Sequence, residues 1–195
     1  MSVKMAAHVE KVEGLTVRSL FQWEPGESDI LSHLILALKG PHRARAWRHW
    51  ALQFARHHEG HLPSGAWQVL SAPSSKKTKG RDHADSWGEG LADLHGLRFE
   101  GKLFGRPGGS HRFLNRDRRM KEHGLVKLTE SPVNRHRAWI MADDILTTGA
   151  TAQAVYRALQ RPKHFEIWCL ARRTHISCAA SGSMLRLGEL KGFQI

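Results

Sequence analysis

A chain of 195 residues, 41% of them hydrophobic, is long and apolar enough to bury a core, which excludes a disordered polypeptide. Its two cysteines exclude a disulfide framework and favour the reducing cytoplasm, and its longest apolar run, residues 30–38, is too short for membrane insertion. Its 30 lysines and arginines outnumber 18 acidic residues, and the net charge of +12 indicates anionic partners: nucleic acid, phosphorylated metabolites or anionic lipid.

The first part of the chain, residues 1–65, is predicted to be mainly helical. Weak patterns in residues 1–27 indicate short strands or an irregular lead-in. Apolar residues at helical spacing predict one helix over residues 29–38 and a second over residues 43–58. Each run ends close to a glycine, which favours termination of the helix there.

The helix predicted over residues 43–58 interleaves basic and aromatic side chains. Such a pattern can hold single-stranded nucleic acid, because cations contact phosphates and aromatic rings stack on bases. It fits equally an amphipathic helix whose tryptophans are buried and whose arginines are solvated, and both interpretations stay open. The residues concerned are Arg43, Arg45, Trp47, Arg48, His49, Trp50 and Arg56.

Strands alternate with helices from residue 66 onward. The alternation predicts an α/β fold with a mostly parallel sheet flanked by helices, whose core covers residues 66–173 and is followed by a tail, residues 174–195. Ligands of such sheets collect at the carboxyl ends of the strands. The predicted strands are 66–72, 98–104, 125–128, 138–142 and 165–171, and the predicted helices are 82–94, 114–123 and 151–161.

The stretch MADDILTTGAT, residues 141–151, carries two kinds of ligand group at the end of a buried strand. Asp143 and Asp144 can accept hydrogen bonds from vicinal sugar hydroxyls and can hold Mg²⁺, directly or through water. The small-residue loop after them leads into a helix, whose first N–H groups favour a phosphate. Together they describe a ribose 5-phosphate site, in which the phosphate is cradled by Thr147, Thr148, Gly149, Ala150 and Thr151.

This stretch resembles the phosphoribosyl diphosphate (PRPP) signature of type I phosphoribosyltransferases: an apolar strand, two acids, an apolar pair and TTGAT. The resemblance implies the type I phosphoribosyltransferase fold, with a mostly parallel sheet flanked by helices and a small variable hood. It also implies PRPP as the ligand and Mg²⁺ as the cofactor. Asp143 and Asp144 would then be the catalytic residues, which hold the ribose and, indirectly, the metal.

Basic residues are expected to face the pyrophosphate of PRPP. The resemblance places this role on the loop after the strand 66–72, with Arg119 as a further candidate on a separate segment. The alternative for the loop is a solvated surface turn, which charged runs usually form. The loop residues are Lys76, Lys77, Lys79 and Arg81.

A longer part of the chain, about residues 20–173, resembles the ComF competence-protein family. The family's cysteine zinc ribbon is not found in the sequence, and its Arg-Gly-Phe-Asn-Gln run is replaced by KGRDH. The resemblance implies one phosphoribosyltransferase-like domain over residues 1–195, with single-stranded DNA and other competence proteins as partners; homodimers are common among phosphoribosyltransferases. The matching segments are HLILALKG at 33–40, VLSAPSSKKTKGRDHA at 69–84, SHRFLNRDRRMKE at 110–122 and CLARR at 169–173.

Thr147 narrows the expected acceptor. In phosphoribosyltransferases that use 6-oxopurines, the signature carries an acid at this place that is credited with base chemistry on the purine. A threonine hydroxyl cannot act as a general base near neutral pH. The resemblance therefore argues against a 6-oxopurine acceptor.

Three functions remain open. The first is a ComF-like phosphoribosyltransferase that binds PRPP and Mg²⁺ and transfers phosphoribose to an unknown acceptor, with release of pyrophosphate. The second is a non-catalytic single-stranded-DNA-binding competence or DNA-uptake factor on the same scaffold, and the third is a regulator that senses PRPP. The acceptor pocket would belong to the variable hood, expected in parts of residues 1–65 and the tail.

Overall fold

The computed structural model describes residues 5–23, 29–38, 43–59, 66–73, 83–105, 125–128 and 135–174. Their centre is a six-stranded sheet made of β1 (His8–Val12), β2 (Leu15–Trp23), β3 (Trp67–Ser71), β4 (Arg98–Gly101), β7 (Ala138–Leu146) and β8 (Phe165–Arg173). The strand order is β1-β2-β8-β7-β3-β4, and every neighbouring pair is parallel except β1–β2. The predicted α/β fold with a mostly parallel sheet is confirmed.

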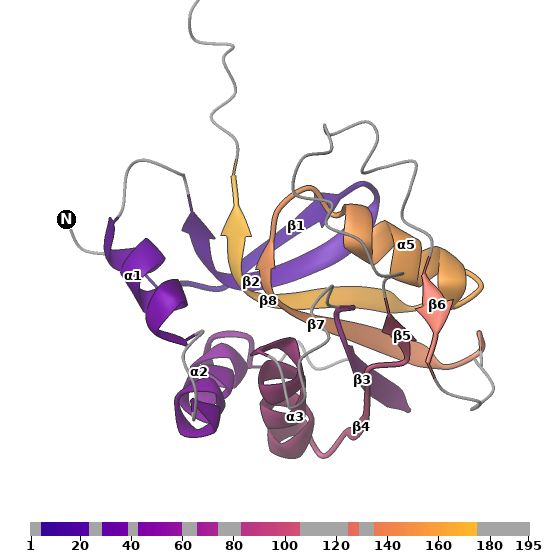
Figure 1. Cartoon of the computed structure of the whole chain (residues 1–195), viewed down its shortest axis with the longest axis horizontal. Coiled ribbons are helices and arrows are strands. Elements are labelled where there is room, and N and C mark those ends of the chain that lie inside the picture. The colour runs from indigo at the N-terminus through magenta and orange to yellow at the C-terminus, as the bar shows by residue number, and fades with distance from the viewer. Residues whose placement is uncertain are drawn as a thin grey trace, which may run out of the picture.

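The helices of the described residues are α1 (Asp29–Leu38), α2 (Ala44–His57), α3 (His83–His95) and α5 (Ala150–Ala158), and a ribbon pairs β5 (Phe104–Gly105) with β6 (Val126–Lys127). Helices cover both faces of the sheet: Figure 1 shows α5 on one side and α2 and α3 on the other. Trp87 of α3 packs in one core with Ile140, and Val155 of α5 packs in the other with Met141. None of these described helices has the length and apolarity that crossing a membrane requires.

A hairpin of residues 8–23 belongs to the sheet, which corrects the expectation that residues 1–65 are mainly helical and that the sheet begins at residue 66. Its strands β1 and β2 join through a two-residue turn. The turn residues Glu13 and Gly14 have φ angles of 51° and 81°, and a type I′ hairpin turn requires positive φ at both positions. The sequence signal was weak because glutamate occupies a place that asparagine or aspartate usually takes.

Strand β7 is longer than the predicted strand 138–142. Pairing with β8 continues to Leu146↔Arg172, which carries β7 past both acids. The chain leaves β3 towards β4 and leaves β7 towards β8, so the two connections diverge from the β3–β7 boundary. Ligands of α/β proteins bind in the crevice beside such a switch point, outside the carboxyl ends of the strands.

Candidate functional site

Asp143 and Asp144 lie in the last part of β7, at the carboxyl edge of the sheet, and both residues are half-buried. The strand backbone orients them. The Asp144 N–H donates to Oδ1 of Asp143 at 2.9 Å, and the Ile145 N–H donates to Oδ1 of Asp144 at 2.9 Å.

The thiol of Cys169 shows which face Asp143 occupies. Cys169 is the β8 partner of Asp143 and is buried in the core under α5. Burial raises the pKa of the Cys169 thiol far above its usual range, and the nearby charge of Asp143 raises this pKa further. Asp143 therefore projects on the α5 side of the sheet.

The predicted phosphate loop connects β7 to α5 at the same edge of the sheet. Thr147 is exposed, whereas Thr148 and Thr151 are half-buried. The Ala150 N–H donates weakly to the Thr148 hydroxyl at 3.4 Å. The first turn of α5 has no acidic side chain, so its N–H groups and the positive end of the helix dipole suit an external anion.

Gly149 shapes the start of α5. It is the N-cap residue, with φ of 77°, which is a left-handed conformation that glycine adopts without strain. A Cβ at this position would lie 3.1 Å from Cγ1 of Val12 in the β1–β2 hairpin. The Gln153 side chain donates to the Glu13 carbonyl at 2.7 Å. The β1–β2 hairpin, where the sequence indicated short strands or an irregular lead-in, thus packs directly against the predicted phosphate loop.

Arg172, near the end of β8, holds the other side of this loop. Its Nη1 donates to the carbonyl oxygens of Leu146, at 3.3 Å, and of Thr147. Its Nε lies 3.4 Å from Oε1 of Glu10 on β1. Arg172 is absent from the site residues predicted from the sequence, because a guanidinium that reaches the carbonyls of another strand leaves no local pattern. The only sequence feature that pointed to Arg172 was its place in the CLARR run at residues 169–173, which resembles the ComF family.

Replacing Arg172 by lysine is expected to weaken ribose 5-phosphate binding by about tenfold. Lysine keeps the charge but lacks the planar guanidinium, whose Nη1 contacts both carbonyls while its Nε faces Glu10. One charge-assisted contact is worth roughly 1.5–3 kcal/mol, which corresponds to tenfold or more in Kd. Calorimetry measures the affinity. Arg173→Lys is the matched control, because Arg173 lies over the Trp23 ring, 5.4 Å from its centroid; equal affinities of the two variants would contradict this role.

The basic residues expected at the pyrophosphate lie outside the described residues: Lys76, Lys77, Lys79, Arg81 and Arg119. The end of β3 that precedes the first four is described. The Ala72 N–H donates to the Ala142 carbonyl at 2.8 Å. The described chain after β3 therefore ends beside the acids of β7.

The donor set of the site fits Mg²⁺. This ion prefers oxygen ligands, keeps several waters, and is commonly held by one or two carboxylates together with substrate phosphates. The part of the chain that the structure describes contains no group of three or more His, Cys, Asp or Glu side chains that could hold a metal. Asp143 and Asp144 thus suit a Mg²⁺ that binds together with a phosphorylated ligand.

The arginine-bearing helix α2 directs its tryptophans inward. Trp47 is buried in the core and donates its indole N–H to the Leu38 carbonyl at 3.2 Å. Trp50 packs edge-on against Phe21, with ring centroids 5.5 Å apart. Buried rings cannot stack on bases. For Trp47 the amphipathic interpretation is therefore correct.

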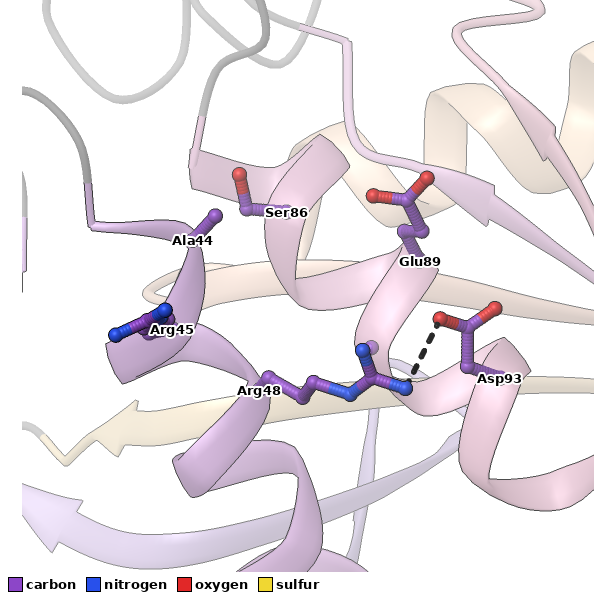
Figure 2. A pocket seen from close by; sticks show the side chains of 7 residues that line it. Ala44, Arg45, Arg48, Ser86, Glu89 and Asp93 are labelled. Carbon is purple, nitrogen blue, oxygen red and sulfur yellow. Dashed lines mark ion pairs between the residues drawn. The ribbon is translucent and has the colours of Figure 1, made fainter.

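A pocket of about 230 Å³ lies between α2 and α3, and Figure 2 shows basic and acidic side chains around it. Arg48 reaches from α2 towards Asp93 of α3, at 3.8 Å, and both side chains are largely exposed. Solvent screens such a pair, so it contributes little to stability. Because Glu89 and Asp93 line the pocket together with Arg45 and Arg48, it lacks the single sign of charge that a polyanion needs.

The fold and the site define an α/β protein whose sheet edge joins paired carboxylates to a helix N-terminus. Among solved structures, it is similar to a hypoxanthine phosphoribosyltransferase from Staphylococcus aureus, with 8% identity, a TM-score of 0.44, and coverage of 68% of this chain and 75% of that one. A hypoxanthine phosphoribosyltransferase from Trypanosoma cruzi has 11% identity, a TM-score of 0.41 and 66% coverage of each chain. No protein-family model and no curated protein matches the chain.

Proposed function

We propose that the chain is a ComF-like phosphoribosyltransferase that binds PRPP and Mg²⁺ and transfers phosphoribose to an acceptor, with release of pyrophosphate. One observation carries the proposal: β7 contains Asp143 and Asp144 at its end, and the threonine loop after it runs directly into the N-terminus of α5. A ribose 5-phosphate complements this arrangement, with its hydroxyls at the carboxylates and its phosphate at the helix N–H groups.

The reaction requires little covalent chemistry from the protein. A nucleophile, commonly nitrogen, forms a bond to the ribose C1 while the bond from C1 to the pyrophosphate oxygen breaks, and the nucleophile's proton passes to solvent. Such a step needs positioning and neutralisation of the leaving charge. Mg²⁺, when bound, neutralises part of that charge. Asp143 and Asp144 would hold the ribose, and further positive charge is predicted from Lys76, Lys77, Lys79, Arg81 and Arg119.

The class of acceptor is constrained by Thr147. The solved structures named above are hypoxanthine enzymes, but their resemblance to this chain is too distant to transfer a substrate. Thr147 stands where a 6-oxopurine enzyme would need an acid, and its hydroxyl cannot replace that acid as a base. We therefore infer an acceptor other than a 6-oxopurine.

Calorimetry with PRPP and with ribose 5-phosphate, each with and without Mg²⁺, tests the proposal. The expected result is binding of both ligands, with PRPP binding strengthened by Mg²⁺. If neither ligand binds, the proposal of a ribose 5-phosphate site at the end of β7 is refuted. A pyrophosphate-release assay with nitrogen acceptors then separates transfer from sensing: Mg²⁺-dependent PRPP binding without release under any acceptor would favour the PRPP-sensing regulator.

A second candidate function, binding of single-stranded DNA, is favoured by a different surface. The amino ends of β7 and β8 are adjacent, because the Trp139 N–H donates to the His164 carbonyl at 3.0 Å. Exposed basic residues precede both strands. In the turn from α5 to β8, Gln160 and Arg161 have φ angles of 62° and 54°. Such a left-handed backbone is strained in residues other than glycine, and strain of this kind is often associated with function. This amino edge consists of Arg135, His136, Arg137, Arg157, Arg161, Lys163 and His164.

A triple variant of the amino edge, Arg157→Gln, Arg161→Gln and Lys163→Gln, is expected to weaken binding to single-stranded DNA. Each lost phosphate contact reduces the salt slope by about 0.7, so the slope should fall by about 2. Fluorescence anisotropy over a salt series measures it. The matched control removes three exposed arginines at α2, namely the N-cap residue Arg43 together with Arg45 and Arg56 of the helix. A larger loss in the control than in the triple variant would exclude the amino edge as the interface.

A further inference from the structure

A second group of polar side chains joins three elements at the carboxyl edge of the sheet. Ser71, the last residue of β3, is fully buried and donates its hydroxyl to Oδ1 of Asp85 at 2.5 Å. The other oxygen, Oδ2 of Asp85, lies 3.2 Å from Nζ of Lys102. Asp85 is in the first turn of α3, and Lys102 directly follows β4. We name Ser71, Asp85 and Lys102 the Asp85 cluster.

The Asp85 cluster lies next to the acids of β7. Ser71 pairs across the sheet with Ala142, the residue before Asp143. One turn after Asp85, α3 approaches β7 so closely that a Cβ at Gly88 would lie 3.1 Å from the Cβ of Ala142. Only β3 separates β4 from β7, and neighbouring strands are about 4.8 Å apart. An extended ligand that begins at the β7 acids can therefore reach the end of β4.

We propose that Lys102 is a diphosphate-binding residue of this site and that Asp85 is the positioning residue that holds its ammonium there. The inference rests on the proposed function, because it takes PRPP as the ligand. An ammonium has three N–H donors, so it can contact Asp85 and a phosphate oxygen together. The Lys102 side chain is 24% exposed, which leaves it within reach of a ligand, while the buried Ser71 fixes the carboxylate.

Stability alone is a weak reason for this lysine to be held at the sheet edge. A carboxylate in the first turn of α3 already complements the helix dipole without a cation. A partly exposed ion pair adds little, because solvent screens it and two side chains lose freedom. The useful result of the contact is a lysine ammonium that is held in one place beside the switch point, on the sheet edge that also carries Asp143 and Asp144.

Calorimetry with PRPP and ribose 5-phosphate, each with Mg²⁺, tests the role because only PRPP carries the diphosphate. Lys102→Met is expected to weaken PRPP binding about tenfold and to change ribose 5-phosphate binding less than about twofold. Lys102→Arg keeps the charge and should restore most of the affinity. Asp85→Asn should weaken PRPP binding more than ribose 5-phosphate binding. The matched control is Arg98→Gln, at the start of β4, where Arg98 pairs with Glu100 at 2.6 Å; neither affinity should change.

Unchanged PRPP affinity in Lys102→Met, or an equal loss for both ligands, would overturn the assignment of Lys102. A gain in PRPP affinity in Asp85→Asn would overturn the positioning role, because it would mean that Asp85 competes with the diphosphate for Lys102. Each of these results leaves the proposed function standing as long as the wild-type protein binds both ligands. A wild-type protein that binds neither refutes the proposed function and this inference with it.

Discussion

The double replacement Asp143→Asn and Asp144→Asn is expected to weaken PRPP binding in the presence of Mg²⁺ by roughly two to four orders of magnitude. An asparagine oxygen can still accept the backbone N–H bonds of β7, but it lacks the charge that favours Mg²⁺ and ribose hydroxyls. Two charge-assisted contacts of roughly 1.5–3 kcal/mol each account for this range. Calorimetry measures the affinity, and circular dichroism checks that the sheet has formed.

The control for this variant is Asp93→Asn. Asp93 is an exposed acid of α3 that pairs with Arg48 at 3.8 Å, away from the end of β7. Its replacement removes a negative charge without touching the candidate site, so PRPP affinity should stay unchanged. A folded double variant that binds PRPP as tightly as the wild type would show that the two carboxylates do not hold the ligand.

Gly149→Ala is expected to lower the free energy of unfolding by about 2–3 kcal/mol. A left-handed backbone costs a residue with a Cβ roughly 1–2 kcal/mol, and φ at this position is 77°. The new Cβ would also meet Cγ1 of Val12 at 3.1 Å, which is closer than ordinary contact and pushes on the hairpin. For a chain of this size the melting temperature should fall by about 4–12 °C, and PRPP binding should weaken because the phosphate loop shifts.

The Gly14→Ala variant separates the cost of the left-handed backbone from the cost of crowding against Val12. Gly14 has a similar φ of 81°, but a Cβ there would meet nothing within 4 Å. It should therefore show only the backbone part of the loss, about 1–2 kcal/mol. Differential scanning calorimetry of both variants gives the difference, which measures crowding against Val12. Equal losses in the free energy of unfolding would mean that crowding between the hairpin and the loop does not contribute to the effect of Gly149→Ala.

The parts of the fold that could be predicted are those with a strong local signal. Strands β3, β7 and β8 are apolar runs because both of their faces are buried, and α5 begins at a glycine where the small-residue loop ends. The acids and the threonine loop could also be placed together at the end of a strand, because the loop directly follows that strand in the chain. Local chemistry of this kind needs no knowledge of distant partners.

The parts that could not be predicted depend on distant partners. Arg172 contacts the Leu146 carbonyl from 26 residues away, and Asp85 is joined to Ser71 and Lys102 only once three elements have packed. The burial of Trp47 follows from α3, whose Gly90 allows a close approach: a Cβ there would lie 3.2 Å from the Cβ of Ala51. The β1–β2 hairpin lacked both a strong apolar alternation and a typical turn pair, so its place in the sheet was missed.

The pairing of β2 with β8 has a consequence for biosynthesis. An ion pair between Arg18 and Glu166 joins residues 148 positions apart at 2.8 Å, so β2 has no parallel partner until β8 has been synthesised. Closing so long a loop is slow, and unpaired strand edges are prone to aggregation in the meantime. The hairpin that packs against the loop after β7 and the arginine that contacts the carbonyls of this loop are far apart in the sequence. Nascent chains are therefore expected to acquire ligand-binding competence only after β8 has emerged from the ribosome, and to depend on chaperones until then.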